Sequence, residues 1–499
     1  MSAIITEKFR QHNATQFFES FSESSKSTYY LFVGKATAYT SGTTGGSDSS
    51  PPTPSDSPTD TEFYAWDSML AAKKIASTDI AFAIPRRNWV NGTTYDMYEH
   101  DISSSNTSTS GASNLYDSTF YIVTSAFRVY KVLDNNGGTA YDGAEPTSTS
   151  TSPFELGGYV LKFMYDISTT DIGKYVTTDF VPVATDSTVS AAATDGSIES
   201  LRITAGSSYT DGTYYAAVYG DGTSQGTSDG AIVRITVSGG AIASFGLTAG
   251  TDTTIHAAGV GYTFGYVNLG VGYTFSDSGL SSASNMGGTG GAVEVIISPE
   301  GGHGKNAVTE LGGHFIMTAT TISQAENDDF STANDFRTVG IVIDPTNYGT
   351  TTVATATTAR QTNVVKFSSS SGTFEADEVI TQATTGAVGK VVEWDSVLSL
   401  LYYQQESFKG FGTNSTTGGL VAFSGTNTIT GGTSGATGTP SSTSSETVTL
   451  ANSNTLTLTT GYANPELQPD SGDIIYLENR KPIQRASDQT EDIKIIIEF

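Results

Sequence analysis

The sequence predicts a mainly β protein: a multi-layer β-sheet or sandwich core with two N-terminal helices and inserted small β-domains. After about residue 75 the chain consists of short runs rich in Val, Ile, Thr, Tyr and Phe, separated by Gly, Asn, Asp and Ser. Helical periodicity is confined to the residues before that point. Several Gly-rich and Thr-rich segments also repeat themselves, as inserted β-modules do. With 499 residues, the chain is long enough for more than one core.

The first predicted helix begins near Thr6, which can cap its N-terminus, and Glu7 is favourably placed in its first turn. Its apolar residues recur at the spacing of one helical face, so we expect this face to pack on a core. These residues are Ala14, Phe17, Phe18 and Phe21.

The second predicted helix covers residues 59–74, "TDTEFYAWDSMLAAKK". Thr59 and Glu62 have the spacing of a capping box. Phe63, Trp66 and Leu70 would lie on one face of this helix. The Pro-rich and Gly-rich stretch between the two helices predicts an exposed loop.

The C-terminus predicts a strand with one apolar face, because every second residue of its last seven is apolar. These residues are Ile493, Ile495, Ile497 and Phe499. We therefore expect the end of the chain to be tied into a sheet.

Three internal repeats lie in the β region, and each predicts a short strand followed by a Gly turn. Because Gly/Thr/Ser-rich sequence matches itself easily, low-complexity drift is the alternative interpretation. The pairs are "GSIESLRITAG" (196–206) with "GAIASFGLTAG" (240–250), "GVGYTF" at 259–264 and at 270–275, and "VITQATTGAVG" (379–389) with "TITGGTSGATG" (428–438).

Composition limits the possible partners. The chain has 51 acidic and 24 basic residues, a net charge of −27, which opposes binding to nucleic acid or to an anionic membrane. Without cysteine it can form no disulfide and no thiolate metal site. The N-terminus lacks a signal-peptide pattern, and no apolar run reaches the ~18 residues of a membrane helix. We expect a soluble protein that is made in a cytoplasm.

Residues with catalytic chemistry are few. His303 and His314 lie eleven residues apart in "GGHGKNAVTELGGHF", where a metal site is the less favoured alternative to turn glycines around exposed or hydrogen-bonded imidazoles. Ser224 stands in a nucleophile-elbow pattern, yet a strand rather than a helix follows it, so a hairpin turn is the better interpretation. The clusters at Asp134 and Glu326 lack the spacing of a calcium loop. We expect no catalytic residue, no metal site and no cofactor.

Five segments, in the same order along the chain, resemble the baseplate wedge subunit of T-even-like contractile-tailed phages, the product of gene eight. The C-terminal segment "IYLENRKPIQRASDQTEDIKIIIEF" carries the closest resemblance. The other four are "IITEKFR" (4–10), "AIPRRNW" (83–89), "GYVLKFMYDI" (158–167) and "NDFRTVGIVIDP" (334–345).

The chain is longer than the family pattern, and the additional residues coincide with the repeat-rich segments. The resemblance therefore divides the chain into core and inserted β-domains, and the inserts inherit nothing from the family. The core parts are 1–187, 291–360 and 467–499, and the inserted domains are 188–290 and 361–466.

The resemblance implies a structural virion protein of the tail baseplate and not an enzyme. Such a subunit would form a homodimer, link neighbouring wedge proteins, and take part in the rearrangement that triggers sheath contraction. Other partners that the resemblance suggests are tail-fibre or peripheral baseplate proteins, with no nucleic acid and no membrane among them.

Charged residues inside the resembling segments are the candidate interface. Arginine side chains suit pairing with carboxylates across subunits, although each of them could instead stabilise its own subunit. The candidates are Arg86, Arg87, Arg337, Glu478, Arg480, Lys481 and Arg485.

Two other classes of function remain open. The first is a peripheral baseplate or tail-fibre adhesin that binds host-surface glycan through the inserted β-modules. The second is an enzyme that acts on surface polysaccharide. With three tryptophans, the chain has few aromatic platforms for a carbohydrate-binding cleft.

Overall fold

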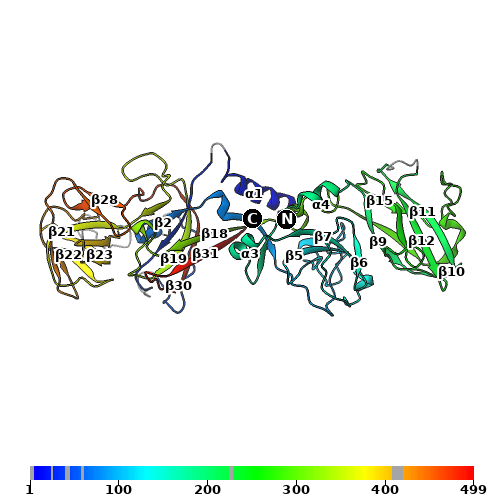
Figure 1. Cartoon of the computed structure of the whole chain (residues 1–499), viewed down its shortest axis with the longest axis horizontal. Helices are drawn as coiled ribbons and strands as arrows, with labels where there is room; N and C mark the ends of the chain where they lie inside the picture. Colours follow the sequence, from blue (N-terminus) through cyan, green and yellow to red (C-terminus); the bar gives the residue numbers. More distant parts are fainter. Residues whose placement is uncertain (1–4, 24–25, 40–44, 58–60, 224–228, 407–419) are drawn as a thin grey trace. The chain divides into compact units, whose positions relative to one another are not determined.

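A computed structural model describes residues 5–23, 26–39, 45–57, 61–223, 229–406 and 420–499 (Figure 1). The chain forms two compact units. Unit 1 comprises residues 1–18, 81–317 and 496–499, and unit 2 comprises residues 19–80 and 318–495. The structure is mainly β, as predicted, and its sheets are antiparallel. None of the helices in the described ranges has the length and apolar character that a membrane span requires.

The central sheet of unit 2 has five strands in the order β20-β2-β1-β19-β30. Its middle strand β1, "YYLFVG", is buried along its whole length, because neighbours cover both of its edges and side chains cover both of its faces. Strand β30 lies at one edge of the sheet. The bounds are β20 Thr358–Arg360, β2 Met69–Lys74, β1 Tyr29–Gly34, β19 Phe336–Ile343 and β30 Asp473–Ile483.

The prediction of one helix over 59–74 is wrong in its second half. Helix α2 covers Thr61–Ser68, and the chain continues as strand β2. Residues 69–72 are all buried, whereas a surface helix would expose one face. Pairing with β1 and β20 supplies the backbone partners that a longer helix would have supplied. Thr59, the predicted cap, lies outside the described residues.

The second sheet of unit 2 has seven strands in the order β24-β23-β22-β25-β26-β21-β29. Strand β21 also pairs with β24, so six strands form a closed ring without an open edge. An apolar cluster of its own, which includes Phe367, Phe374 and Tyr403, fills it. The bounds are β24 Leu400–Gln404, β23 Ala387–Asp395, β22 Val379–Gln382, β25 Ile429–Gly431, β26 Thr437–Pro440, β21 Asn363–Ser371 and β29 Tyr462–Ala463.

The last repeat pair forms two equivalent hairpins, as predicted. In the first copy Ile380 pairs with Gly389, and in the second Ile429 pairs with Gly438 at the same repeat positions. The two hairpins meet through β22 and β25, where Thr381 pairs with its own repeat equivalent. The first pair differs: residues 198–204 form strand β9, whereas the second copy forms only the two-residue strand β13.

The remaining elements of unit 2 are short. Strands β27 and β28 form a separate hairpin, and helix α6 is a single turn with positive φ at Asn327 and Asp328. The bounds are β27 Glu446–Thr449, β28 Thr455–Leu458, α6 Glu326–Asp329 and the 3-10 helix η1 Ser77–Asp79.

Unit 1 contains an aromatic core on the sheet β4-β5-β7-β6. Strands β5 and β7 are almost completely buried, and the rings of Tyr121, Tyr130 and Tyr159 are fully covered. This core gives unit 1 a rigid centre. The bounds are β4 Tyr121–Val123, β5 Arg128–Asp134, β7 Tyr159–Asp166 and β6 Phe154–Leu156.

A second apolar cluster of unit 1 involves the strands between residues 198 and 297. Strand β9 pairs with β17, β10 pairs with β16, and a further sheet has the order β13-β12-β11-β15 with β14 beside β12. The bounds are β9 Ile198–Thr204, β17 Ala292–Ile297, β10 Ser207–Tyr209, β16 Gly287–Thr289, β13 Ala241–Ile242, β12 Ile232–Ser238, β11 Gly212–Gly220, β15 Gly265–Val267 and β14 Thr254–Ala257.

A four-stranded sheet of order β31-β18-β3-β8 contains the predicted C-terminal strand. Strand β31 begins at Thr490, and Ile495 is its buried isoleucine. Helix α1 confirms the first predicted helix: Ala14 is buried, and Phe18 stacks on Phe82 at 4.5 Å. The bounds are β31 Thr490–Glu498, β18 Phe315–Ser323, β3 Ile80–Pro85, β8 Phe180–Pro182, α1 Glu7–Glu19, α3 Thr169–Tyr175, α4 Ser187–Ala192, α5 Ala307–Glu310, η2 Leu115–Asp117, η3 Asn136–Gly138 and η4 Ala283–Asn285.

Candidate functional site

Arg86 and Arg87 follow strand β3, and contacts within their own unit hold both side chains. Arg86 Nη1 donates to the carbonyl of Thr177 at 2.9 Å. Arg87 Nη2 donates to the carbonyl of Tyr116 at 2.6 Å, and its guanidinium lies 4.5 Å from the ring centre of Tyr121. Both arginines therefore connect loops of unit 1 to its aromatic core.

Arg337, on β19, is 6% exposed and forms a buried fork. Its Nε and Nη2 donate to the two carboxylate oxygens of Asp48, both at 3.0 Å, and Nη2 also reaches Asp335 at 3.1 Å. This pairing holds the pKa of Asp48 below its usual value. Arg337 thereby fixes the segment around Asp48 to the central sheet of unit 2.

Arg485 lies between β30 and β31, and its side chain is 2% exposed. It pairs in a bidentate way with Glu491, at 3.1 Å from Nε and 3.0 Å from Nη2. Nη1 donates to the carbonyls of Phe330 and Ser331, and Nη2 donates to that of Gln324. One guanidinium thus ties together three separate stretches of unit 2.

The three other candidates lie together on the edge strand β30. Arg480 is 49% exposed, and the ion-pair partner that the structure gives it is Glu478, at 3.4 Å and 39% exposed. Lys481 is exposed and has no hydrogen-bond or ion-pair partner among the described residues. The hydroxyl of Tyr476 donates to Glu478 at 2.9 Å. We call Glu478, Arg480 and Lys481 the β30 charge strip.

The seven candidates therefore fall into two groups. Arg86, Arg87, Arg337 and Arg485 use their donors inside their own unit, and the β30 charge strip remains open to solvent. A role in an interface stays a prediction for all seven.

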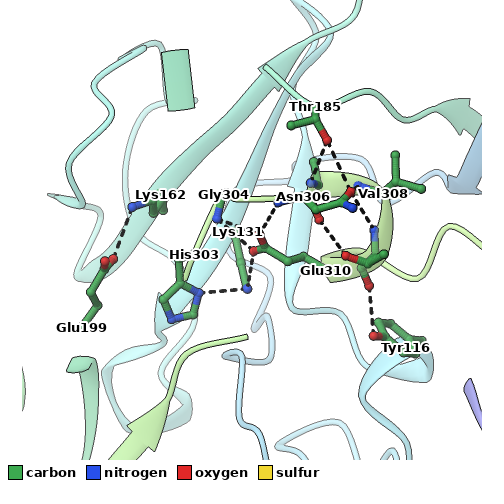
Figure 2. A network of polar contacts seen from close by, with 12 residues as sticks. Tyr116, Lys131, Lys162, Thr185, Glu199, His303, Gly304, Asn306, Val308 and Glu310 are labelled. Atoms are coloured by element: carbon green, nitrogen blue, oxygen red, sulfur yellow. Dashed lines mark hydrogen bonds and ion pairs between the residues drawn. The ribbon is translucent and has the colours of Figure 1, made fainter. Parts of the chain in front are cut away.

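Unit 1 contains a buried polar network that joins β5 to the turn before helix α5 (Figure 2). Lys131 Nζ lies 2.9 Å from His303 Nδ1 and 3.0 Å from Glu310 Oε2. The carboxylate of Glu310 also accepts from the backbone N–H groups of Gly304 and Asn306. All three side chains are buried, Lys131 and His303 completely. The network fixes the 303–310 turn onto a core strand.

Burial and neighbouring charge set the protonation of this network. Burial lowers the pKa of Lys131, and the carboxylate of Glu310 opposes that shift. The pKa of His303 lies well below its usual value because of burial and of the cations Lys131 and Lys162. A neutral His303 accepts from Lys131 at Nδ1 and carries its proton on Nε2, which has no partner among the described residues.

A lysine, a histidine and a glutamate in contact could transfer protons in an enzyme. Here Lys131 also lies over the ring of Tyr98, 3.8 Å from its centre, and no face of the cluster is open to solvent. A substrate would have no contact with these groups. The geometry supports a structural ion pair that holds a turn.

The two histidines of the Gly-rich motif are not brought together. His303 belongs to the buried network, and the side chain of His314 lies 3.6 Å from Glu7 and is 7% exposed. Both imidazoles are buried, so neither ring is exposed. The ring of His303 is hydrogen-bonded, which is the other arrangement that we expected. No described group of three or more His, Asp or Glu residues is placed to hold a metal ion. Ser224 lies outside the described residues.

The buried network was missed at the sequence level, although one signal was readable. Lys131 interrupts the apolar strand "RVYKVLD", where a charge is expected only with a buried partner. Its partner Glu310 lies 179 residues further along the chain, and no local pattern connects the two.

Comparison with known proteins gives one family. The family model described as "Phage-Gp8: Bacteriophage T4, Gp8" matches residues 3–153 and 444–499. The resembling segments 4–10 and 83–89 and the C-terminal segment lie in these ranges, whereas 158–167 and 334–345 lie between them. No curated protein matches the chain.

Proposed function

The chain belongs to the Gp8 family of phage baseplate wedge proteins, and on that premise we propose that it links neighbouring wedge subunits through strand β30. Membership in the family makes it a structural component of the virion baseplate. The finer roles in this proposal are homodimer formation, contact with tail-fibre or peripheral proteins, and participation in the rearrangement that triggers sheath contraction. Catalysis forms no part of the proposed function.

The observation that carries the proposal is a contrast among the seven candidates. The β30 charge strip is exposed, whereas the other four arginines donate to acceptors inside their own unit. Strand β30 is the edge of a five-stranded sheet: the carbonyl of Pro52 accepts from the side chain of Asn479, and no described strand pairs with the outer side of β30. Arg480 and Lys481 are cations whose donors are largely unused by the residues that the structure describes. Such side chains on an open edge suit contact with carboxylates of another subunit.

Strand β30 also has the charge order that a two-fold contact between copies requires. If two copies pair antiparallel with Asn479 at the centre, Glu478 of each copy faces Arg480 of the other. Each opposite-charge pair of this kind contributes roughly 0.2–1 kcal/mol. Pro482 lacks a backbone N–H and would end the pairing soon after Lys481. This geometry supports the homodimer in our proposal.

The five-segment organisation also remains our proposal. The family match leaves residues 154–443 unmatched, which supports additional residues between two matched parts. The closed ring with its own apolar cluster supports an independent module within 361–466. The match resumes at 444, inside the predicted insert 361–466, and residues 154–187 and 291–360, which we assign to the core, lie outside the matched ranges.

The test is a charge reversal with a matched control. Arg480→Glu with Lys481→Glu changes the strip, and Lys8→Glu with Lys305→Glu makes the same change of charge at exposed sites of unit 1. Melting temperature, sedimentation velocity and co-assembly with the other wedge proteins of the same phage would be measured for both. We expect both variants to melt like the wild type, and only the β30 variant to lose at least about tenfold in association.

Two results would contradict the proposal. If the β30 variant associates and assembles like the control, the strip is only a solvated face. If both variants lose assembly equally, net charge rather than β30 controls association.

A further inference from the structure

We propose that unit 1 carries a binding platform for a neutral glycan, formed by Tyr219, Phe264, Tyr266 and Tyr273. We call these four residues the aromatic platform. The proposal goes beyond the structural role of the wedge protein and uses none of the residues of the β30 charge strip.

The platform lies on the face of a sheet opposite to the larger apolar cluster of unit 1, and a small cluster of Ala217, Ile232 and Phe275 covers part of that face. Tyr219 of β11 and Tyr266 of β15 are directly paired across the two strands, and their rings stack at 5.5 Å. The neighbouring pair, Val218 and Val267, packs on the apolar cluster of unit 1. Because side chains alternate along a strand, the two tyrosines face the other way. Tyr266 is 55% exposed.

The two copies of "GVGYTF" complete the platform. In the first copy Tyr262 is buried and Phe264 is 57% exposed, and in the second Phe275 is buried and Tyr273 is half-buried against its cluster. The ring of Tyr273 is 6.2 Å from that of Tyr219. Each repeat therefore buries one aromatic ring as an anchor and presents the other beside β11.

Two aspartates fix the repeats in place. Asp221 accepts from the backbone N–H groups of Thr263 and Phe264, at 2.9 and 3.2 Å. Asp229 accepts from the N–H of Ser276 at 3.0 Å. These bonds hold the surface rings before any ligand arrives, so binding would cost little ordering entropy.

The charge around the platform selects the ligand. Asp221 and Asp229 bind the segments that carry the surface rings, and Asp277 follows the second repeat, whereas the chain between residues 203 and 293 has no lysine and one arginine. An acidic polysaccharide, a phosphate or a nucleic acid would meet uncompensated negative charge there. A neutral sugar has an apolar C–H face that stacks on aromatic rings, and hydroxyl groups that hydrogen-bond to carboxylate oxygens.

The size of the platform also favours a small ligand over a protein. Four partly exposed rings offer on the order of 400 Å² of aromatic surface. A stable protein interface needs about 800 Å² from each partner. One or two sugar rings of a longer chain fit the smaller area.

The experiment measures retardation of the full-length chain in native gels that contain a polysaccharide. Dextran, mannan and galactomannan are the neutral probes, and alginate and hyaluronan are the acidic ones. The variants are Tyr266→Ala, Phe264→Ala and Tyr266→Phe. Tyr348→Ala is the matched control, because Tyr348 is an exposed tyrosine of unit 2 with 41% exposure. Circular dichroism and melting temperature verify that each variant is folded.

We expect at least one neutral probe to retard the protein, and each alanine variant to weaken binding about tenfold. Tyr266→Phe and Tyr348→Ala should bind like the wild type. Absence of retardation by every neutral probe, binding to acidic probes alone, or equal binding by all variants would overturn the proposal. Association of the chain with itself that depends on Tyr266 and Phe264 would overturn it in favour of an interface between copies.

Discussion

Arg480 and Arg485 are five residues apart, yet the structure uses them in opposite ways. Arg485 is covered and saturated by Glu491 and three backbone carbonyls. Arg480 is half exposed and has one long contact with Glu478. The comparison shows that a charge-dense segment need not be an interface as a whole: one part of it holds the chain together, and the other is free to contact a partner.

The largest effect is expected from breaking the buried part. Arg485→Met leaves Glu491 without its partner and leaves backbone carbonyls without a donor, so unfolding should become easier by about 3–5 kcal/mol. Arg480→Met, the matched control on β30, should cost less than about 1 kcal/mol because the pair is exposed. Chemical denaturation of the two variants would measure the difference. Equal stability of both variants would contradict the conclusion that Arg485 stabilises the fold and Arg480 does not.

Lys131 of unit 1 is a second buried cation, which can be compared with Arg485. Lys131→Met leaves Glu310 buried with only its backbone donors, and we expect a loss of about 3 kcal/mol. Adding Glu310→Leu should restore part of this loss, since the uncompensated carboxylate is then removed as well. Denaturant midpoints of the single and double variants provide the measurement. A double variant no more stable than the single one would show that the network contributes through shape and not through charge.

Asp329, a half-buried acid without a cation at contact distance among the described residues, is a third case. Asp329 accepts from Thr358, and burial together with the charge of Glu466 raises its pKa to about 7 from the model-peptide value of 3.8. The folded chain therefore binds this proton more tightly than the unfolded chain. Its contribution to stability is fully present below about pH 4 and is lost as the pH rises to about 7.

Asp329→Asn cannot ionise, and we expect its stability to fall less between pH 4 and pH 7.5 than that of the wild type. Denaturation at several pH values gives the slope. The exposed Asp488→Asn is the control and should follow the wild type. A variant at Asp329 with the slope of the wild type would contradict the assignment.

Local patterns in the sequence were sufficient for some elements. The alternation at the C-terminus predicted β31, and the Gly turns of residues 379–389 and 428–438 predicted their two hairpins. The local pattern predicted the wrong element at residues 69–74. Alanine and lysine there favour a helix, but these residues pair with β1 and β20 and form a strand. Tertiary pairing overrode helix propensity there.

The sequence did not show which of the candidate residues are buried and which are exposed. Arg485 meets Phe330 across 155 residues, and Arg337 meets Asp48 across 289. Burial depends on contacts at that separation, and the composition of "ENRKPIQR" is the same whichever arginine is covered. The family resemblance identified the segment, but only the fold separates anchors from exposed charge.

Site-specific crosslinking tests the role of the β30 charge strip most directly. The chain has no cysteine, so Lys481→Cys creates one attachment point for a photo-crosslinker, and Lys305→Cys creates a control point at an exposed site of unit 1. Irradiation of assembled baseplates followed by mass spectrometry would identify the chain joined to each position. We expect position 481 to crosslink to another baseplate chain or to a second copy, far more efficiently than position 305. Crosslinks from position 481 that stay within its own chain, or that are no more frequent than those from position 305, would contradict the account.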